Sequence, residues 1–178
     1  MEVGSNLFQF KFKSEFELDR VVRGGPWSFD NQVLMLRRWQ PRMTAANVKF
    51  DSMALWIQIW GAPFDMVSPK VATKIDKRMG DVVEVEKRTG QDTQHLFMRV
   101  KVALPTSKPL RRGAFLGSSD GQNTWVHFKY ERLPMFCHFC EIMGHDLKNC
   151  AQHYASRKNG VEEACQYGEW LKATGGQS

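Results

Sequence analysis

The sequence predicts an α+β protein: a mixed or antiparallel sheet with helices on one face, then a small zinc-binding module and a short C-terminal helix. Three observations support this prediction. Several segments alternate apolar and polar residues as half-buried strands do, two others carry helix start signals, and four metal-ligand side chains lie close together near the C-terminal end. With 42% hydrophobic and 25% charged residues, the 178-residue chain has a globular composition, which excludes disordered, collagenous and coiled-coil classes.

The first predicted elements are a strand and a short helix. Residues 6–13 alternate apolar and polar side chains, and their apolar members are expected to pack in a core rather than face a ligand: Phe8, Phe10 and Phe12. Ser14 followed by Glu17 forms a capping-box pattern, so a helix should begin there. Glycines at positions 24 and 25 should end this helix, because glycine tolerates the backbone conformations that close helices.

A turn over residues 26–31 and a strand over 32–39 complete this first unit, which by itself is too small to be stable. We therefore expect it to pair with the second unit or to belong to a larger domain. In that second unit, Ser68 and Pro69 predict a helix start and Gly80 its end. Further strands are predicted over residues 54–60, 82–86, 96–104, 114–116 and 124–132.

The motif with the clearest chemistry is the series Cys137, Cys140, His145 and Cys150, whose spacing is that of a zinc knuckle. Three thiolates and one imidazole complete a tetrahedral zinc site and leave no position open for a substrate, so one structural Zn²⁺ is expected and catalytic zinc is not. Incidental buried cysteines are the alternative. Cys165 is expected to be a partly buried, non-ligating side chain on a helix over residues 161–173.

Four segments carry a resemblance to a known family: residues 24–29, 33–39 and 55–63, and the cysteine and histidine motif. They resemble the plant family called domain of unknown function 4283, whose members are similar to the gag-like first open reading frame products of plant LINE-type retrotransposons. The resemblance implies a body like an RNA-recognition motif and a non-catalytic, nucleic-acid-binding chain. Family members usually carry an earlier strand and helix, so the chain is expected to be truncated at its N-terminus.

These observations predict three parts: an α+β body over residues 1–134, a zinc knuckle over 135–151 and a helical or partly disordered tail over 152–178. The excess of basic residues lies in the body, which should attract the phosphates of nucleic acids. The candidate nucleic-acid contacts are Phe139 and Met143 on the knuckle and Arg111, Arg112, Lys129, Arg132, Arg37 and Arg38 on the body. The aromatic side chains expected to pack instead are Trp27, Trp39, Trp56 and Trp60.

The predicted function is zinc-dependent binding of single-stranded nucleic acid, with RNA favoured over DNA and self-association left open. A protein-interaction or assembly module with a structural knuckle is the alternative. We expect no enzymatic activity and no small-molecule substrate, because no catalytic set or phosphate-binding loop can be placed in the sequence. No apolar run approaches the roughly 18 residues of a membrane span. Without a secretion signal, an intracellular location in the nucleus or cytoplasm is expected.

Overall fold

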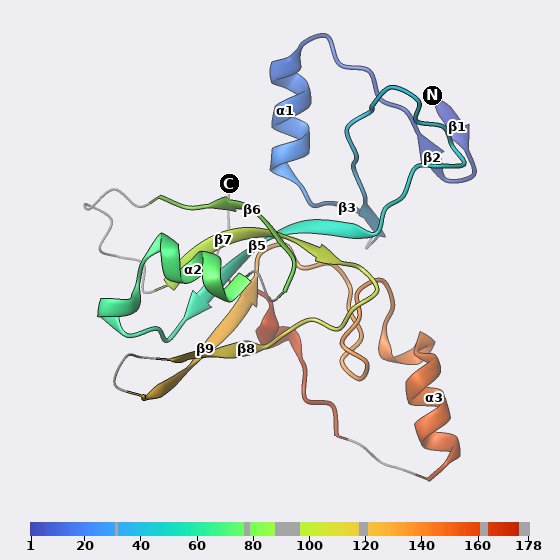
Figure 1. Ribbon diagram of the computed structural model, residues 1–178. Helices are drawn as coiled ribbons and strands as arrows, with labels where there is room; N and C mark the ends of the chain where they lie inside the picture. Colours follow the sequence, from blue (N-terminus) through green and yellow to red (C-terminus); the bar gives the residue numbers. More distant parts are fainter. Residues whose placement is uncertain (31, 77–78, 88–96, 118–120, 161–163, 175–178) are drawn as a thin grey trace.

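The centre of the protein is a five-stranded antiparallel sheet, here called the main sheet (Figure 1). The computed structural model describes residues 1–30, 32–76, 79–87, 97–117, 121–160 and 164–174. The strand order in the main sheet is β6-β7-β5-β9-β8, and every neighbouring pair is antiparallel. The strands are β5 (Ser52–Trp60), β6 (Asp81–Val85), β7 (Phe97–Pro105), β8 (Gly113–Gly117) and β9 (Asn123–Tyr130). The α+β prediction is thus confirmed, with the expected chain order in this unit.

One face of the main sheet holds the core. Successive side chains of a strand point to opposite faces, so Leu55, Ile57 and Ile59 of β5 share the buried face, and each is fully buried. Helix α2 (Pro69–Asp76) covers this face and contributes Ala72 and Ile75 to the core. The remaining buried apolar side chains of the main sheet are Met53, Met98, Val100, Val102, Leu104, Leu116, Val126, Phe128 and Tyr130.

Helix α2 begins as its sequence predicts. The backbone nitrogen of Val71 donates to Ser68 Oγ at 3.3 Å, and Pro69 occupies the first helical position, where its missing N–H costs nothing. The described helix ends at Asp76, whereas the predicted helical pattern reached residue 79, and residues 77–78 lie outside the described part of the chain. The residues Ser-Asp-Gly-Gln at 119–122 also predict a turn, of which residues 119–120 lie outside the described part.

The N-terminal unit, residues 1–35, consists of one helix and two short hairpins. Strand β1 (Glu2–Gly4) pairs with β2 (Leu7–Phe8), and β3 (Trp27–Phe29) pairs with β4 (Gln32–Leu34). Between the hairpins lies α1 (Glu15–Gly24), in which Ser14 Oγ accepts from the backbone nitrogen of Glu17 at 3.2 Å, as the capping box predicts. Within the described residues neither hairpin joins the main sheet.

Two predictions for the N-terminal unit are wrong. The predicted strand over residues 6–13 shrinks to β2, and the predicted strand over 32–39 ends at Leu34, while part of the predicted turn forms β3. An isolated hairpin has no apolar layer to pack against, so the alternating side chains stay exposed. The exposed fractions of those expected in the core are 48% for Phe8, 55% for Phe10 and 37% for Phe12.

The end of α1 contacts the main sheet. Lys101 Nζ donates to Arg23 O at 3.1 Å, and the guanidinium of Arg132 donates to Gly24 O. Cations beside the last carbonyl groups of a helix complement its dipole. Of the four tryptophans expected to pack, Trp27 and Trp39 are exposed, whereas Trp56 and Trp60 are half-buried on the main sheet.

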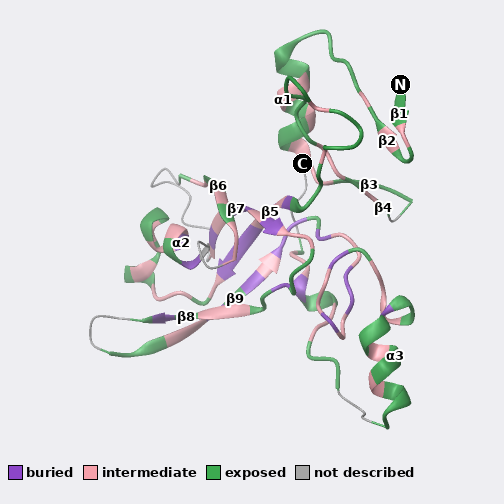
Figure 2. Ribbon diagram, turned by 45° about the vertical axis from the view of Figure 1, so that its right-hand side comes forward, coloured by how far each residue is buried: buried purple, intermediate pink, exposed green. Residues whose placement is uncertain are grey.

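A short helix follows the knuckle, as predicted, but it lies earlier in the chain than expected. The predicted helix over residues 161–173 is wrong in its described portion: residues 164–168 are irregular, a single 3₁₀ turn, η3, spans Glu169–Leu171, and Cys165 is exposed rather than partly buried. A helix forms earlier instead, as α3 (Ala151–Lys158). Segment η3 returns to the main sheet, where Leu171 is fully buried and Ala173 N donates to Tyr130 O at 2.9 Å. Figure 2 shows α1 and α3 largely exposed, whereas the buried residues of the main sheet gather in its central strands β5 and β7. Among the described helices none is long and apolar enough to cross a membrane.

Candidate metal centre

The three cysteines and the histidine of the predicted motif meet at one point. One ligand atom from each of Cys137, Cys140, His145 and Cys150 lies within 4.8 Å of the others, and Cys140 Sγ is 3.2 Å from His145 Nε2. All three sulfur-bearing residues are buried and His145 is half-buried. The four ligands of this short stretch of chain thus form a single cluster, as the spacing predicts.

Short-range backbone hydrogen bonds position these ligands. Cys137 N donates to Ile142 O at 2.9 Å, and Glu141 N donates to Cys137 O at 2.9 Å, which folds the first two cysteines into a tight loop. Gly144 follows with a φ of 98°, a left-handed conformation that glycine adopts without steric cost and that turns the chain toward the histidine.

The last ligand has a second role. Cys150 is the N-cap of α3, and its Sγ accepts from the backbone nitrogen of His153 at 3.4 Å. The preceding turn, η2 (Leu147–Asn149), is capped by Asp146, whose carboxylate accepts from Asn149 N at 3.0 Å. The metal loop and α3 therefore share one residue, so ordering the loop also fixes where the helix begins.

The pKa values of two of the cysteines are shifted in opposite directions. Burial and the neighbouring sulfurs of Cys137 and Cys150 together outweigh a hydrogen bond from the Ile142 backbone and raise the pKa of Cys140 to about 11. At Cys150 burial also opposes ionisation, but hydrogen bonds from His153 N and His145 outweigh it and lower the pKa to about 7. A bound metal ion would deprotonate such thiols, and a soft S₃N donor set suits Zn²⁺. The residues fit one structural zinc, and all four positions are filled by protein.

The metal loop is packed against the main sheet. Phe136 and Met143 pair in an antiparallel bridge, and both belong to the main hydrophobic core with exposed fractions of 4% and 7%. Leu110 N donates to Glu141 O at 2.9 Å, and Tyr167 Oη donates to Leu110 O at 3.0 Å. The knuckle thus adds its own apolar side chains to the body.

Of the two knuckle residues predicted to contact bases, one stays accessible. Phe139 is half-buried, with its ring centroid 5.1 Å from that of His153 in an edge-on arrangement. Met143 is instead buried in the core, because the bridge to Phe136 turns its side chain toward the body. That placement leaves no Met143 surface for stacking.

The basic pair of Arg111 and Arg112 lies beside the knuckle. Both residues are exposed, and their backbone is clamped to the sheet because Tyr130 Oη donates to Arg111 O at 2.7 Å and accepts from Arg111 N at 3.2 Å. The preceding residue, Leu110, carries the hydrogen bond to the metal loop. Two cations are therefore held in place where the body meets the knuckle.

The other predicted cations are placed differently. Arg37 donates to Lys49 O at 2.7 Å, Arg38 pairs with Glu15 and Asp19, and Arg132 is engaged with the end of α1. Arg38 and Arg132 therefore contact α1 of the N-terminal unit, whereas Arg37 contacts the segment that leads into β5. Lys129 lies on β9, with its Nζ 5.5 Å from the centroid of the Trp60 ring.

Two cations that the prediction omitted lie on the helix that follows the metal loop, at the end opposite the ligand Cys150. Arg157 and Lys158 occupy the last turn of α3, the helix that begins at the ligand Cys150. The sequence signal that could have revealed these two residues is Cys150 as the N-cap of a helix, because a helix that begins there carries both basic side chains.

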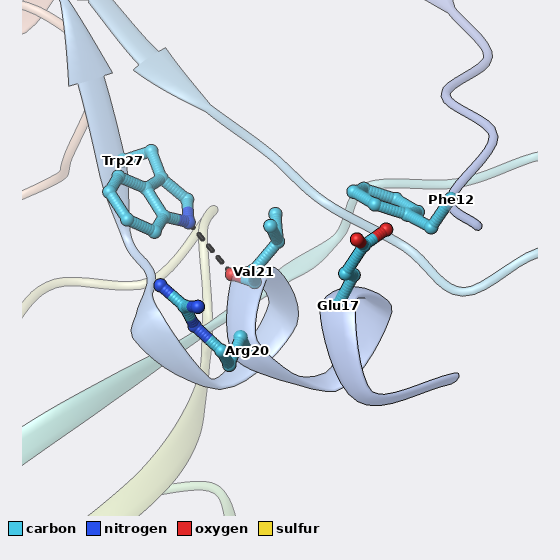
Figure 3. A pocket seen from close by; sticks show the side chains of 5 residues that line it. All are labelled: Phe12, Glu17, Arg20, Val21 and Trp27. Carbon is cyan, nitrogen blue, oxygen red and sulfur yellow. Dashed lines mark hydrogen bonds between the residues drawn. The ribbon is translucent and has the colours of Figure 1, made fainter. Parts of the chain in front are cut away.

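A shallow hollow lies away from this site, on the N-terminal unit (Figure 3). It has a volume of about 310 Å³. In it Trp27 Nε1 donates to Val21 O at 2.8 Å, so the indole closes the end of α1. Its lining contains no cysteine, histidine or paired carboxylates and offers no metal site: Phe12, Glu17, Arg20, Val21 and Trp27.

Comparisons with known proteins agree with this geometry. Residues 104–152 match the family model described as a zinc knuckle, and residues 1–47 match the model of a domain of unknown function (DUF4283). An uncharacterized protein of Arabidopsis thaliana is 27% identical over 134 residues, which is 75% of this chain and 42% of that protein. The chain thus spans less than half the length of this curated relative. No solved structure matches.

Proposed function

We propose that this chain, with a zinc knuckle joined to a basic α+β body, binds single-stranded nucleic acid and performs no catalysis. Zinc would order the metal loop, Arg111 and Arg112 would hold phosphates, and Phe139 would stack on an unpaired base. RNA is the favoured ligand. The biological setting that we propose is a gag-like role, in which the protein packages the RNA of a retrotransposon. The buried thiol cluster suits a reducing compartment, so we place the protein in the nucleus or cytoplasm.

The observation that supports this proposal most directly is the hydrogen bond from Leu110 N to Glu141 O, at 2.9 Å. It sets the exposed Arg111 and Arg112 against the metal loop that carries Phe139. A strand of nucleic acid presents phosphates and bases at similar spacing along its length. Fixed cations beside a half-exposed ring therefore provide both kinds of contact that such a strand needs.

A protein-assembly role is the second candidate, and a different observation favours it. The N-terminal unit and the segment that follows it expose several large apolar side chains, with exposed fractions of 70% for Phe16, 85% for Phe29 and 62% for Trp39. Exposed apolar patches mark protein interfaces, and association through them would tolerate salt. Nucleic-acid binding through arginines would weaken steeply as salt is added.

The test is a titration of labelled single-stranded and duplex RNA and DNA at several salt concentrations. Arg111→Glu with Arg112→Glu should weaken binding to every single strand and flatten the slope of log affinity against log salt by roughly 0.7 for each phosphate that the variant no longer neutralises. The matched control reverses two exposed lysines on α2, Lys70→Glu with Lys74→Glu, and should change the slope less.

A third variant separates stacking from charge. Phe139→Ala should lower the affinity for single strands by roughly 1–3 kcal/mol without altering the salt slope, because stacking releases no counterions. If the arginine pair has no more effect than the lysine control, the arginine loop is not the phosphate site. If binding by the unmutated protein is insensitive to salt, the assembly role replaces the proposed function.

A further inference from the structure

The main sheet has a second face, opposite the core, which we call the outer face. Side chains alternate along a strand, so the neighbours of the buried Leu55, Ile57 and Ile59 point to the other side. The cross-strand pairs of Trp60 with Phe97 and His127, and of Gln58 with Arg99 and Lys129, place the following side chains together on it: Trp56, Gln58, Trp60, Phe97, Arg99, Lys101, Phe115, Trp125, His127 and Lys129.

Aromatic rings gather at one end of the outer face. The ring centroids of Trp60 and Phe97 are 4.6 Å apart with a tilt of 34°, and those of Phe115 and Trp125 are 4.8 Å apart in an edge-on arrangement. Phe115 is 63% exposed, and the other three are half-buried. Their counterparts on the core face, such as Ile59, are fully buried. The outer face therefore keeps aromatic surface accessible.

Cations lie over two tryptophan rings of the outer face, Trp56 and Trp60. Arg99 Cζ is 4.0 Å from the centroid of Trp56, and Lys129 Nζ is 5.5 Å from that of Trp60. Lys101 Nζ is 5.9 Å from the Trp56 ring, but it is buried and bonded to the end of α1. The N-terminal unit thus contacts the face near Trp56, two rows of side chains away from the pair of Trp60 with Phe97.

A polar network holds the Trp60 ring in place. Trp60 Nε1 donates to Gln58 Oε1 at 3.0 Å, and Gln58 Nε2 donates to Glu131 Oε1 at 2.9 Å. Arg99 binds the same carboxylate with two hydrogen bonds of 2.8 and 2.7 Å. Because Gln58 and Glu131 are both buried, this network restricts the ring to one orientation and leaves its apolar surface for contacts from outside.

A glycine makes room for the second aromatic pair. An added Cβ at Gly113 would lie 2.5 Å from the indole of Trp125 and 2.2 Å from Val126 O. The indole therefore lies against the backbone of β8 at Gly113 and meets the exposed ring of Phe115 edge-on. Exposed aromatic rings are the surfaces on which unpaired bases stack, whatever their sequence.

We propose that the outer face is a second contact surface for single-stranded nucleic acid, separate from the knuckle. Unpaired bases stack on Trp60 with Phe97 and on Phe115 with Trp125, while Lys129 approaches the backbone phosphates. This inference rests on the proposed function and deepens it, because a stacking surface selects unpaired bases over duplex. Lys129 beside the Trp60 ring complements the charge of the ligand, and Arg99 pairs with both carboxylates that reach the network, Glu131 and Glu86.

The test uses the full zinc-loaded chain and labelled 15-nucleotide oligouridylate and oligothymidylate. Phe115→Ala and Trp60→Leu should each weaken binding by roughly 5- to 150-fold, the range expected when one base no longer stacks on a ring. The control is Phe64→Ala in η1 (Phe64–Met66), an aromatic side chain that is 89% exposed but is not one of the paired rings of the outer face. It should change affinity by less than about twofold, because the proposal places no base on it.

Phe115→Ala keeps the test decisive if Trp60→Leu fails to fold, because the Phe115 side chain lies mostly in solvent. Tryptophan fluorescence supplies a second readout: oligouridylate should quench the emission of the unmutated protein more than that of Trp60→Leu. If Phe115→Ala binds as tightly as the Phe64→Ala control while the arginine pair still weakens binding, the outer face plays no part. If the unmutated protein binds no single strand at low salt, both this inference and the proposed function are wrong.

Discussion

Removing the metal from the knuckle should loosen the main sheet as well as the metal loop. The positions of the ligands, all between Cys137 and Cys150, by themselves predict the opposite, namely that chelation unfolds only the C-terminal module. Phe136 and Met143 flank the metal loop, yet both pack in the core of the body with exposed fractions of 4% and 7%. When the loop loses its metal, these two side chains lose the backbone bridge that holds them in the core.

The expected magnitude follows from that burial. Fully burying a side chain such as Phe or Met contributes about 1.5–3 kcal/mol, so the two residues together couple the loop to the body by about 3–6 kcal/mol. A domain of this kind is stable by about 5–15 kcal/mol in all. The body should therefore stay folded after chelation, but with a markedly smaller free energy of unfolding.

Hydrogen exchange with and without a chelator measures this coupling residue by residue. Chelation should remove protection first at the amides of Cys137 and Gly144, which bond within the knuckle, and then at Leu110, which bonds to Glu141. Protection at Phe128, whose amide bonds to Arg112 O, should fall, whereas Val100 on β7 should change least. Full protection at Leu110 alongside loss at Cys137 would refute the coupling.

A variant separates the apolar contact from the metal itself. Phe136→Ala should retain one zinc per chain, because its side chain is no ligand, yet lower the free energy of unfolding by about 3–5 kcal/mol. Urea denaturation monitors the stability, and a metal assay monitors the zinc. Equal stability of this variant and the unmutated protein would contradict the burial argument.

Two further predictions concern single residues. At Glu131 burial alone would raise the pKa, but hydrogen bonds from Arg99 and Gln58 outweigh it and lower the pKa, so its stabilising effect is present above the unfolded carboxyl pKa and lost as pH falls through the folded value. Glu131→Gln should cost about 2–3 kcal/mol in urea denaturation at neutral pH and remove that acid dependence; an unchanged pH profile would speak against the network. Cys165, which is exposed and outside the metal cluster, should react first with an alkylating agent in the zinc-loaded protein, and Cys165→Ser should keep one zinc per chain, whereas lost metal would mean that it is a ligand.

Local signals explain what the sequence could predict. The start of α2 depends on Ser68 and Pro69, which act on the backbone beside them, and the metal cluster depends on ligands that all lie between Cys137 and Cys150. The strands of the main sheet alternate over enough residues to be predicted as strands. In each case the physical cause lies within one short segment, so the sequence of that segment is sufficient to predict the structure.

The failures share a different cause. Phe8, Phe10 and Phe12 alternate as a half-buried strand would, but alternation states which side chains could be buried together and not whether a partner layer exists. Helix α3 was missed because its N-cap is Cys150, a residue assigned to metal binding and given no second role. Met143 lies on a loop that looked exposed until the bridge to Phe136 placed it in the core.

The outer face shows why function was harder to locate than fold. Both faces of β5 carry large apolar or aromatic side chains, so periodicity divides Trp56 and Trp60 from Ile57 and Ile59 without saying which set is covered. The two faces differ in contacts between residues that are distant in the sequence. On the outer face Gln58 and Glu131, which lie 73 positions apart, meet through a hydrogen bond. The buried polar groups of this network lie on a face that is otherwise accessible. They are stabilised by the bidentate charge pair of Arg99 with Glu131, and the same network fixes the Trp60 ring beside it. In the proposal above such a face presents its rings to a ligand, and that would distinguish it from the core face of the same strand.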